Sequence, residues 1–133
     1  MGKFSRDKGK RGERATAAEI RAVFPDLDIK RGWQTRSGRD DADVVGLAVA
    51  GRRIWIEVKS GRQPNPRAAL TQAVAAAPPE ALPIAVIRDD RKSPFAALRW
   101  SDLLALLVRA HAAPPLPASP PIAAPPPPLD DPA

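Results

Sequence analysis

The chain of 133 residues contains no cysteine and only one histidine. Without cysteine, no disulfide, thiolate zinc site or cysteine nucleophile can form. The histidine, His111, stands beside a run of prolines, and we interpret it as a bystander rather than a ligand or base. A histidine-based triad or zinc cluster is therefore not expected.

Long apolar stretches are also missing. No run approaches the roughly 18 residues that a membrane span requires. The basic N-terminus lacks the apolar segment of a signal peptide. We therefore expect no membrane association and a cytoplasmic location. The abundance of Ala, Arg, Gly and Pro suggests a GC-rich genome, which points to a bacterial cell or a phage-infected host.

Charge is what the chain has in excess. Its formal net charge is +6, and all 21 Lys and Arg residues lie within residues 1–113. A compact domain this basic indicates a polyanionic partner, of which nucleic acid is the usual one. The alternative is an ordinary solvated surface, so charge alone favours nucleic acid only modestly.

The length predicts one domain. Residues 1–12 form a basic, glycine-containing arm that has little to bury, and residues 13–112 form the folded domain. Ten of the 17 prolines lie in residues 114–133, so the segment 113–133 is predicted to be an extended, disordered Pro-rich tail.

Hydrophobic periodicity predicts an α/β domain with a mixed central sheet flanked by helices. The expected helices are Glu13–Phe24, Arg67–Ala77 and Ser101–Ala110. The expected strands are Leu27–Thr35, Asp43–Val49, Arg52–Ser60, Pro83–Asp89 and a last one near Phe95–Trp100.

The hairpin formed by 43–49 and 52–60 carries the most informative polar residues. A three-residue loop of Val49, Ala50 and Gly51 would pair Asp43 with Glu57, and Lys59 shares the face of Glu57. Two facing carboxylates favour a cation between them, and hard oxygen ligands suit Mg²⁺ or Mn²⁺. Alternatively, these residues are surface charges, and a two-residue loop would shift Asp43 away from Glu57.

The arrangement D-(x)13-E-x-K resembles the PD-(D/E)xK nuclease superfamily, and in particular the archaeal-type Holliday junction resolvases and their phage and bacterial relatives. The matching segments are KGKRGERA, SGRDDADVVGL and IEVKSGRQPNP, with ALTQA and IAVIRDD later in the chain. The resemblance covers about residues 8–107. One departure is Ala42, which stands where the family pattern has proline. The resemblance implies a restriction-endonuclease-like fold.

The resemblance also implies roles for individual residues. Asp43 and Glu57 would hold the metal ion together with the Val58 carbonyl. Glu13 would complete the acidic cluster, directly or through water. Lys59 would orient or deprotonate the attacking water. Ser60 would orient a phosphate or the lysine, and Gln72 matches a glutamine that many superfamily members carry on the following helix.

The function implied is a Mg²⁺-dependent, structure-selective endonuclease acting as a homodimer on branched double-stranded DNA such as a Holliday junction. The alternatives are a repair or restriction-like nuclease of the same fold, and a non-catalytic basic module that binds nucleic acid. The expected DNA contacts are Lys8, Lys10, Arg11, Arg14, Arg36, Ser37, Arg39, Ser60 and Arg62.

Overall fold

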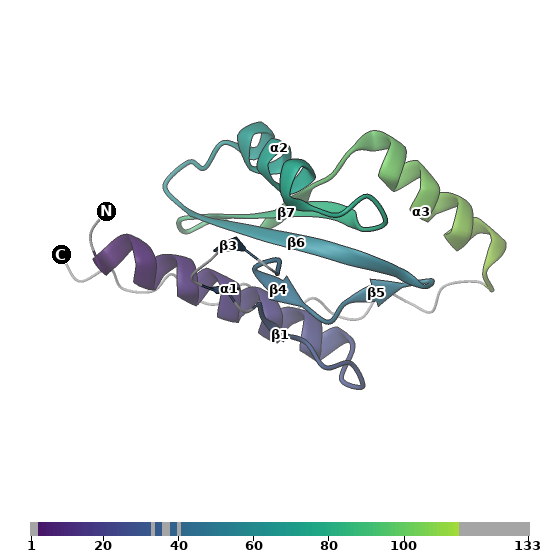
Figure 1. The fold of residues 1–133 in the computed structure, drawn as a ribbon, viewed down its shortest axis with the longest axis horizontal. Coiled ribbons are helices and arrows are strands. Elements are labelled where there is room, and N and C mark those ends of the chain that lie inside the picture. The colour runs from purple at the N-terminus through teal and green to yellow at the C-terminus, as the bar shows by residue number, and fades with distance from the viewer. Residues whose placement is uncertain (1–2, 33, 36–37, 40, 115–133) are drawn as a thin grey trace.

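A computed structural model describes residues 3–32, 34–35, 38–39 and 41–114 (Figure 1). The helices are α1 (Lys3–Val23), α2 (Pro66–Ala76) and α3 (Trp100–Ala112). The strands are β1 (Lys30–Arg31), β2 (Gln34–Thr35), β3 (Gly38–Arg39), β4 (Val44–Val45), β5 (Ala48–Val49), β6 (Arg52–Gly61), β7 (Leu82–Asp89) and β8 (Phe95–Ala97). The predicted α/β class with a mixed sheet is confirmed.

The main sheet is open and has the strand order β1-β4-β6-β7-β8, with β5 also paired to β6. Strands β6 and β7 are parallel, from Ile54 opposite Leu82 to Gly61 opposite Asp89, and the other pairs are antiparallel. Parallel neighbours need a long crossover connection, which here contains α2. Strands β2 and β3 pair with each other in a separate small sheet.

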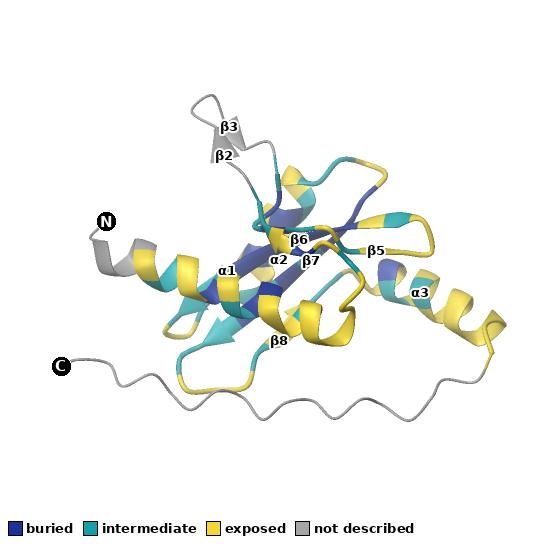
Figure 2. Cartoon of the chain, turned by 90° about the horizontal axis from the view of Figure 1, so that it is seen from below, coloured by how far each residue is buried: buried dark blue, intermediate teal, exposed yellow. Residues whose placement is uncertain are grey.

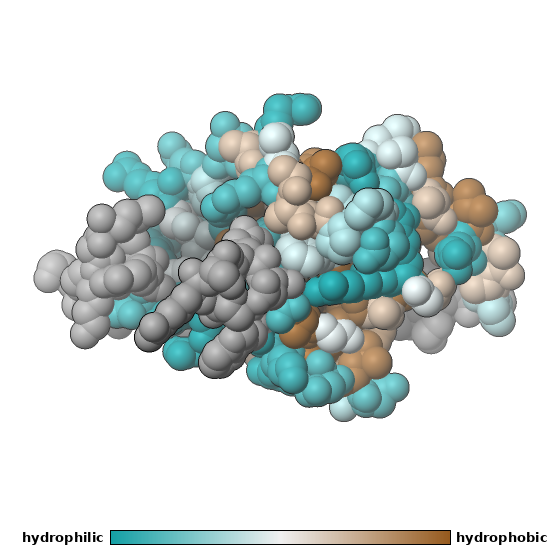
Figure 3. Space-filling model, in the orientation of Figure 1, coloured by the Kyte–Doolittle hydropathy of each residue, from teal (hydrophilic) through white to brown (hydrophobic). Residues whose placement is uncertain are grey.

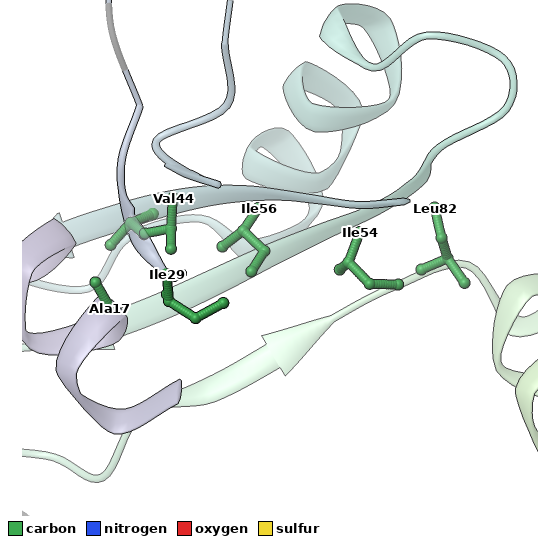
Figure 4. Close-up of a cluster of buried hydrophobic side chains, with 7 residues drawn as sticks. Ala17, Ile29, Val44, Ile54, Ile56 and Leu82 are labelled. Atoms are coloured by element: carbon green, nitrogen blue, oxygen red, sulfur yellow. The ribbon is translucent and has the colours of Figure 1, made fainter. Parts of the chain in front are cut away.

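The alternation of side chains along β6 divides the core into two layers. Ile54, Ile56 and Val58 belong to one buried cluster with Ala17 of α1, and Figure 4 shows several members of that cluster meeting beside α1. Trp55 belongs to a different cluster on the opposite face, which α2 covers. Helices α1 and α2 therefore lie on opposite sides of the sheet, whose central strands are buried (Figure 2).

Helix α1 begins at Lys3, ten residues before the predicted start at Glu13. Residues 3–12 of the predicted basic arm are thus part of a 21-residue helix. Gly9 and Gly12 each weaken a helix by roughly 1 kcal/mol, so local propensity predicts that α1 starts after them. Packing outweighs this preference at Gly12, where a Cβ atom would lie only 2.0 Å from the Ser60 Oγ. Gly12 therefore lets α1 approach β6 closely.

Replacing Gly12 by alanine should destabilise the fold by roughly 1–3 kcal/mol, because the added methyl group overpacks the contact with Ser60. Gly9→Ala is the matched control, since a Cβ atom there meets nothing within 4 Å, and it should stabilise α1. Urea denaturation measures both. Adding Ser60→Ala to Gly12→Ala should restore part of the stability, and equal effects of the two glycine replacements would contradict this packing.

The hairpin closes differently from the prediction. Val49 pairs with Arg52, so the loop has two residues, Ala50 and Gly51, both with positive φ (52° and 80°). Near the loop, the strand pairing is therefore shifted by one residue from the predicted pairing. An extra residue at Gly46 (φ 107°) forms a bulge that removes the shift, so Val44 pairs with Ile56. Asp43 precedes β4, and its N–H donates to the Ile56 carbonyl while its carboxylate accepts from the Val58 N–H. It therefore lies beside residues 56–58 of β6, outside the regular ladder in which its pairing with Glu57 was predicted.

The predicted strand Leu27–Thr35 is interrupted after Arg31. A Cβ atom at Gly32 would lie 1.8 Å from the Ala42 carbonyl oxygen, so the two backbones approach too closely for a side chain. The predicted tail lies outside the described residues from 115 onward. Within the described ranges, no helix has the length and apolarity needed to cross a membrane.

Candidate metal and nucleic-acid site

Asp43 stands where β4 separates from β6, and three hydrogen bonds fix it there. Its backbone N–H donates to the Ile56 carbonyl (2.9 Å), and its carbonyl accepts from the Gly32 N–H (2.9 Å). Its side-chain Oδ2 accepts from the Val58 backbone N–H (2.8 Å). The carboxylate therefore takes the place of a backbone acceptor at the end of the β4–β6 ladder, beside Val58.

Glu57 is buried, with 3% of its surface exposed. The indole Nε1–H of Trp55 donates to its Oε1 at 2.9 Å. The Arg53 guanidinium covers the Trp55 ring, 5.0 Å from its centroid, and lies 3.4 Å from the Asp41 carboxylate. A buried carboxylate needs such donors, since burial without them is costly. Trp55 thus supports Glu57 in a defined orientation.

The backbone of Val58 and the side chain of Lys59 extend this site. In an extended strand the N–H and C=O of one residue point to the same side, so the Val58 carbonyl faces Asp43 as its N–H does. Lys59 shares the face of Glu57 and pairs with Ile87 on β7. It forms no hydrogen bond or ion pair with any of the described residues, which leaves its ammonium for a ligand.

The oxygen atoms available near Asp43 and Glu57 can be compared with the ligands that a divalent cation requires. In the described ranges there is no group of three or more His, Cys, Asp and Glu side chains that could hold a metal ion. Two carboxylates and one carbonyl remain, from Asp43, Glu57 and Val58. Mg²⁺ is usually bound in this way, through one or two carboxylates with waters and substrate phosphates completing its shell. Asp43, Glu57 and the Val58 carbonyl are therefore the residues that could hold Mg²⁺, with waters and substrate completing its shell.

Glu13, the third acid of the predicted cluster, is engaged elsewhere. Its Oε2 accepts a hydrogen bond from the Arg31 Nε at 2.8 Å. Arg31 pairs with Val44, which pairs with Ile56, so this ion pair lies on the α1 face of the sheet. Glu57 lies on the α2 face. The structure thus places the Asp43 carboxylate at the Val58 N–H, next in the chain to Glu57, and engages Glu13 with Arg31 on the other face of the sheet.

Two further predicted residues are placed away from the lysine. Ser60 follows Lys59 and points to the opposite face, where its Oγ is buried against Gly12 without a hydrogen-bond partner. It cannot bind a phosphate from that position. Gln72 is exposed on α2, whose Ala69 and Ala73 face the sheet instead. No hydrogen bond joins Gln72 to the site in the described part of the chain.

The predicted DNA contacts divide into three groups. Lys10, Arg11 and Arg14 are exposed on α1, whereas Lys8 is bound to Asp90 at 2.6 Å. Arg62 is exposed in the loop that follows β6. Arg36 and Ser37 lie outside the described residues, and Arg39 is described only in its backbone, within β3.

Two hydrogen bonds hold the loop that carries Arg62 against the end of β7. The Asp89 carboxylate accepts a hydrogen bond from the Gln63 backbone N–H at 2.9 Å, and the Asp90 N–H donates to the Gly61 carbonyl. The Gln63 hydrogen bond, with help from Lys92, lowers the pKa of the Asp89 carboxyl below its ordinary value. Gln63 itself has a positive φ of 50°, so these contacts hold the loop in a conformation that the chain rarely adopts.

Sequence reasoning missed the support that Trp55 gives to Glu57. The signal was present, because Arg53, Trp55 and Glu57 alternate along one strand and must share a face. What the sequence did not specify was the direction of the indole N–H, which turns toward the carboxylate. Trp55 therefore acts as a positioning residue for Glu57 as well as a core residue.

The chain was compared with protein-family models, with curated proteins and with solved structures, and none of them matches it. A role for the site consequently depends on its residues and their geometry.

Proposed function

We propose that the protein is a Mg²⁺-dependent endonuclease that hydrolyses phosphodiester bonds in branched double-stranded DNA, acting on four-way junctions as Holliday junction resolvases do. One observation carries this proposal. The Asp43 carboxylate accepts a hydrogen bond from the Val58 backbone N–H, which places an acid beside the segment of β6 that carries Lys59 and the buried Glu57. We place the activity in the cytoplasm of a bacterial or phage-infected cell.

In this proposal Asp43, Glu57 and the Val58 carbonyl hold the cation. The bound ion would polarise the scissile phosphate and lower the pKa of a coordinated water. Lys59 orients the attacking water and offers positive charge to the phosphate oxygens. The Val58 N–H and the Trp55 indole N–H keep the two carboxylates oriented before substrate arrives, so little reorganisation accompanies the reaction.

DNA binding is assigned to the exposed basic residues of α1, namely Lys10, Arg11 and Arg14, together with Arg62. Such side chains contact phosphates, which positions a duplex without reading its sequence. Selectivity is therefore expected for the shape of the DNA, and affinity should fall steeply with salt. A four-way junction has approximate two-fold symmetry, which suits a two-fold symmetric homodimer.

The test uses purified full-length protein with three labelled substrates in Mg²⁺: a four-way junction, a linear duplex of the same sequence and a flap. Paired symmetric nicks confined to the junction are expected, and EDTA should abolish them. Cleavage of all three substrates would replace junction selectivity with a general repair or restriction-like activity. Binding without cleavage in either Mg²⁺ or Mn²⁺ would leave only a basic binding module.

A further inference from the structure

Helix α3 packs Leu106 against the core but exposes four other large apolar residues. Trp100 and Val108 are 68% and 69% exposed, and Leu104 and Leu107 are 43% and 49% exposed. In Figure 3, hydrophobic residues stand at the surface over this helix. These four side chains form what we call the outer face of α3.

The inner side of α3 holds both of its charged residues, Asp102 and Arg109. Asp102 is buried, accepts a hydrogen bond from the Arg99 Nε at 2.8 Å and lies 3.6 Å from Arg52. Arg109 donates to the Ala50 carbonyl at 3.0 Å. A surface helix ordinarily buries its apolar stripe and exposes its charges. Helix α3 instead has apolar residues on both sides, and its outer face has no Lys, Arg, Asp or Glu, which is typical of a surface that a partner covers.

The spacing of the outer face identifies the partner. Trp100, Leu104, Leu107 and His111 follow one another at intervals of four, three and four residues, the spacing of a coiled-coil seam. The same intervals are obtained when the helix is read backwards. Two α3 helices can therefore pair antiparallel about a two-fold axis, with Leu104 opposite Leu107 of the partner subunit and Trp100 opposite His111 of the partner subunit.

We propose that the outer face of α3 is the homodimer interface, occupied by α3 of a second copy in this antiparallel register. The four apolar side chains expose on the order of 400 Å² per copy, judged from the size of such side chains. Two copies would thus bury most of the area of a small stable interface, which is about 1,200 Å² in total. Because the face is uncharged, chains of net charge +6 can meet there without like charges opposing each other.

This interface rests on the homodimer assumed in the proposed function. Because its test measures the oligomeric state and not cleavage, the interface and the nuclease activity can be contradicted independently. The variants are Leu104→Glu with Leu107→Glu, and Leu104→Lys with Leu107→Lys. Light scattering coupled to gel filtration, at tens of micromolar, should give a dimer for the wild type and a monomer for each variant alone. An equimolar mixture of the two variants should recover the dimer mass, because each glutamate then faces a lysine.

Val23→Glu and Val23→Lys are the matched controls, since Val23 is a 54% exposed apolar residue on α1, and both should remain dimeric. Circular dichroism confirms that each variant is folded. A monomeric wild type would overturn the proposal, as would a dimer that survives both charge variants or a mixture that stays monomeric.

The register has its own test, because the chain lacks cysteine and single thiols can be introduced cleanly. Leu104→Cys and Leu107→Cys are prepared separately, and the disulfide is formed under mild oxidation. In the antiparallel pair, residues 104 and 107 of opposite copies face each other, whereas two copies of residue 104 are offset by about 4.5 Å along the axis. The mixed disulfide should form several-fold faster than either self-disulfide, and faster self-disulfides would overturn this register.

Discussion

Replacing Asp43 by asparagine, or Glu57 by glutamine, should reduce cleavage of a four-way junction in Mg²⁺ by roughly a hundredfold to a thousandfold. A catalytic metal supplies several kcal/mol of charge stabilisation. Each loss of about 1.4 kcal/mol slows the reaction tenfold. Single-turnover cleavage of the labelled junction measures the effect.

Both substitutions are chosen because they should leave the fold intact. The amide oxygen introduced by Asp43→Asn can still accept from the Val58 N–H, and the amide oxygen introduced by Glu57→Gln can still accept from the Trp55 indole. Junction binding should be retained, since only negative charge is removed. Glu80→Gln, on an exposed glutamate, is the control and should cleave normally. Cleavage that persists in both variants would contradict the proposed role of the acids.

Trp55→Phe should weaken Mn²⁺ binding by roughly ten- to a hundredfold, the range found when a partner of a metal ligand is lost. Phenylalanine keeps the buried ring but cannot donate a hydrogen bond, so Glu57 loses the donor that orients its Oε1. The affinity is measured by titration calorimetry with Mn²⁺ in the absence of DNA. This readout is independent of cleavage.

Ile54→Val is the control for this experiment. Ile54 precedes Trp55 but faces α1, so its shortening should cost about 0.5–1.5 kcal/mol of stability without changing the Mn²⁺ affinity. A loss of Mn²⁺ affinity that is equal in the two variants would mean that Trp55 acts through packing alone. An unchanged affinity in Trp55→Phe would remove its positioning role.

The hairpin shows how far the sequence could specify the candidate site. Alternation along residues 52–60 correctly placed Trp55, Glu57 and Lys59 on one face. The loop length was wrong, because a two-residue turn with two positive φ values usually carries Asn or Asp before Gly, whereas this chain has Ala50. The bulge at Gly46 compensates by one residue. Asp43 lies beside residues 56–58 of β6 but outside the ladder, a placement that local patterns could not indicate.

Contacts between distant segments account for the remaining differences. Nothing near Glu13 in sequence indicates that Arg31 will bind its carboxylate, since the pair joins residues 18 positions apart. The early start of α1 likewise depends on the fit between Gly12 and Ser60, which are far apart in the chain. Local propensity could predict helices and strands, but these pairings are determined by how the layers stack.

Strand β6 lies between β4 and β7 and is covered by α1 and α2 on its two faces. Glu57 and Lys59 belong to this central strand rather than to a loop. Regions of this kind open only when the whole domain unfolds, whereas loops and termini open with little free energy. Heat should therefore remove the candidate site and the native fold in one cooperative step, so that fraying at the ends of the chain leaves the acids and the lysine in place.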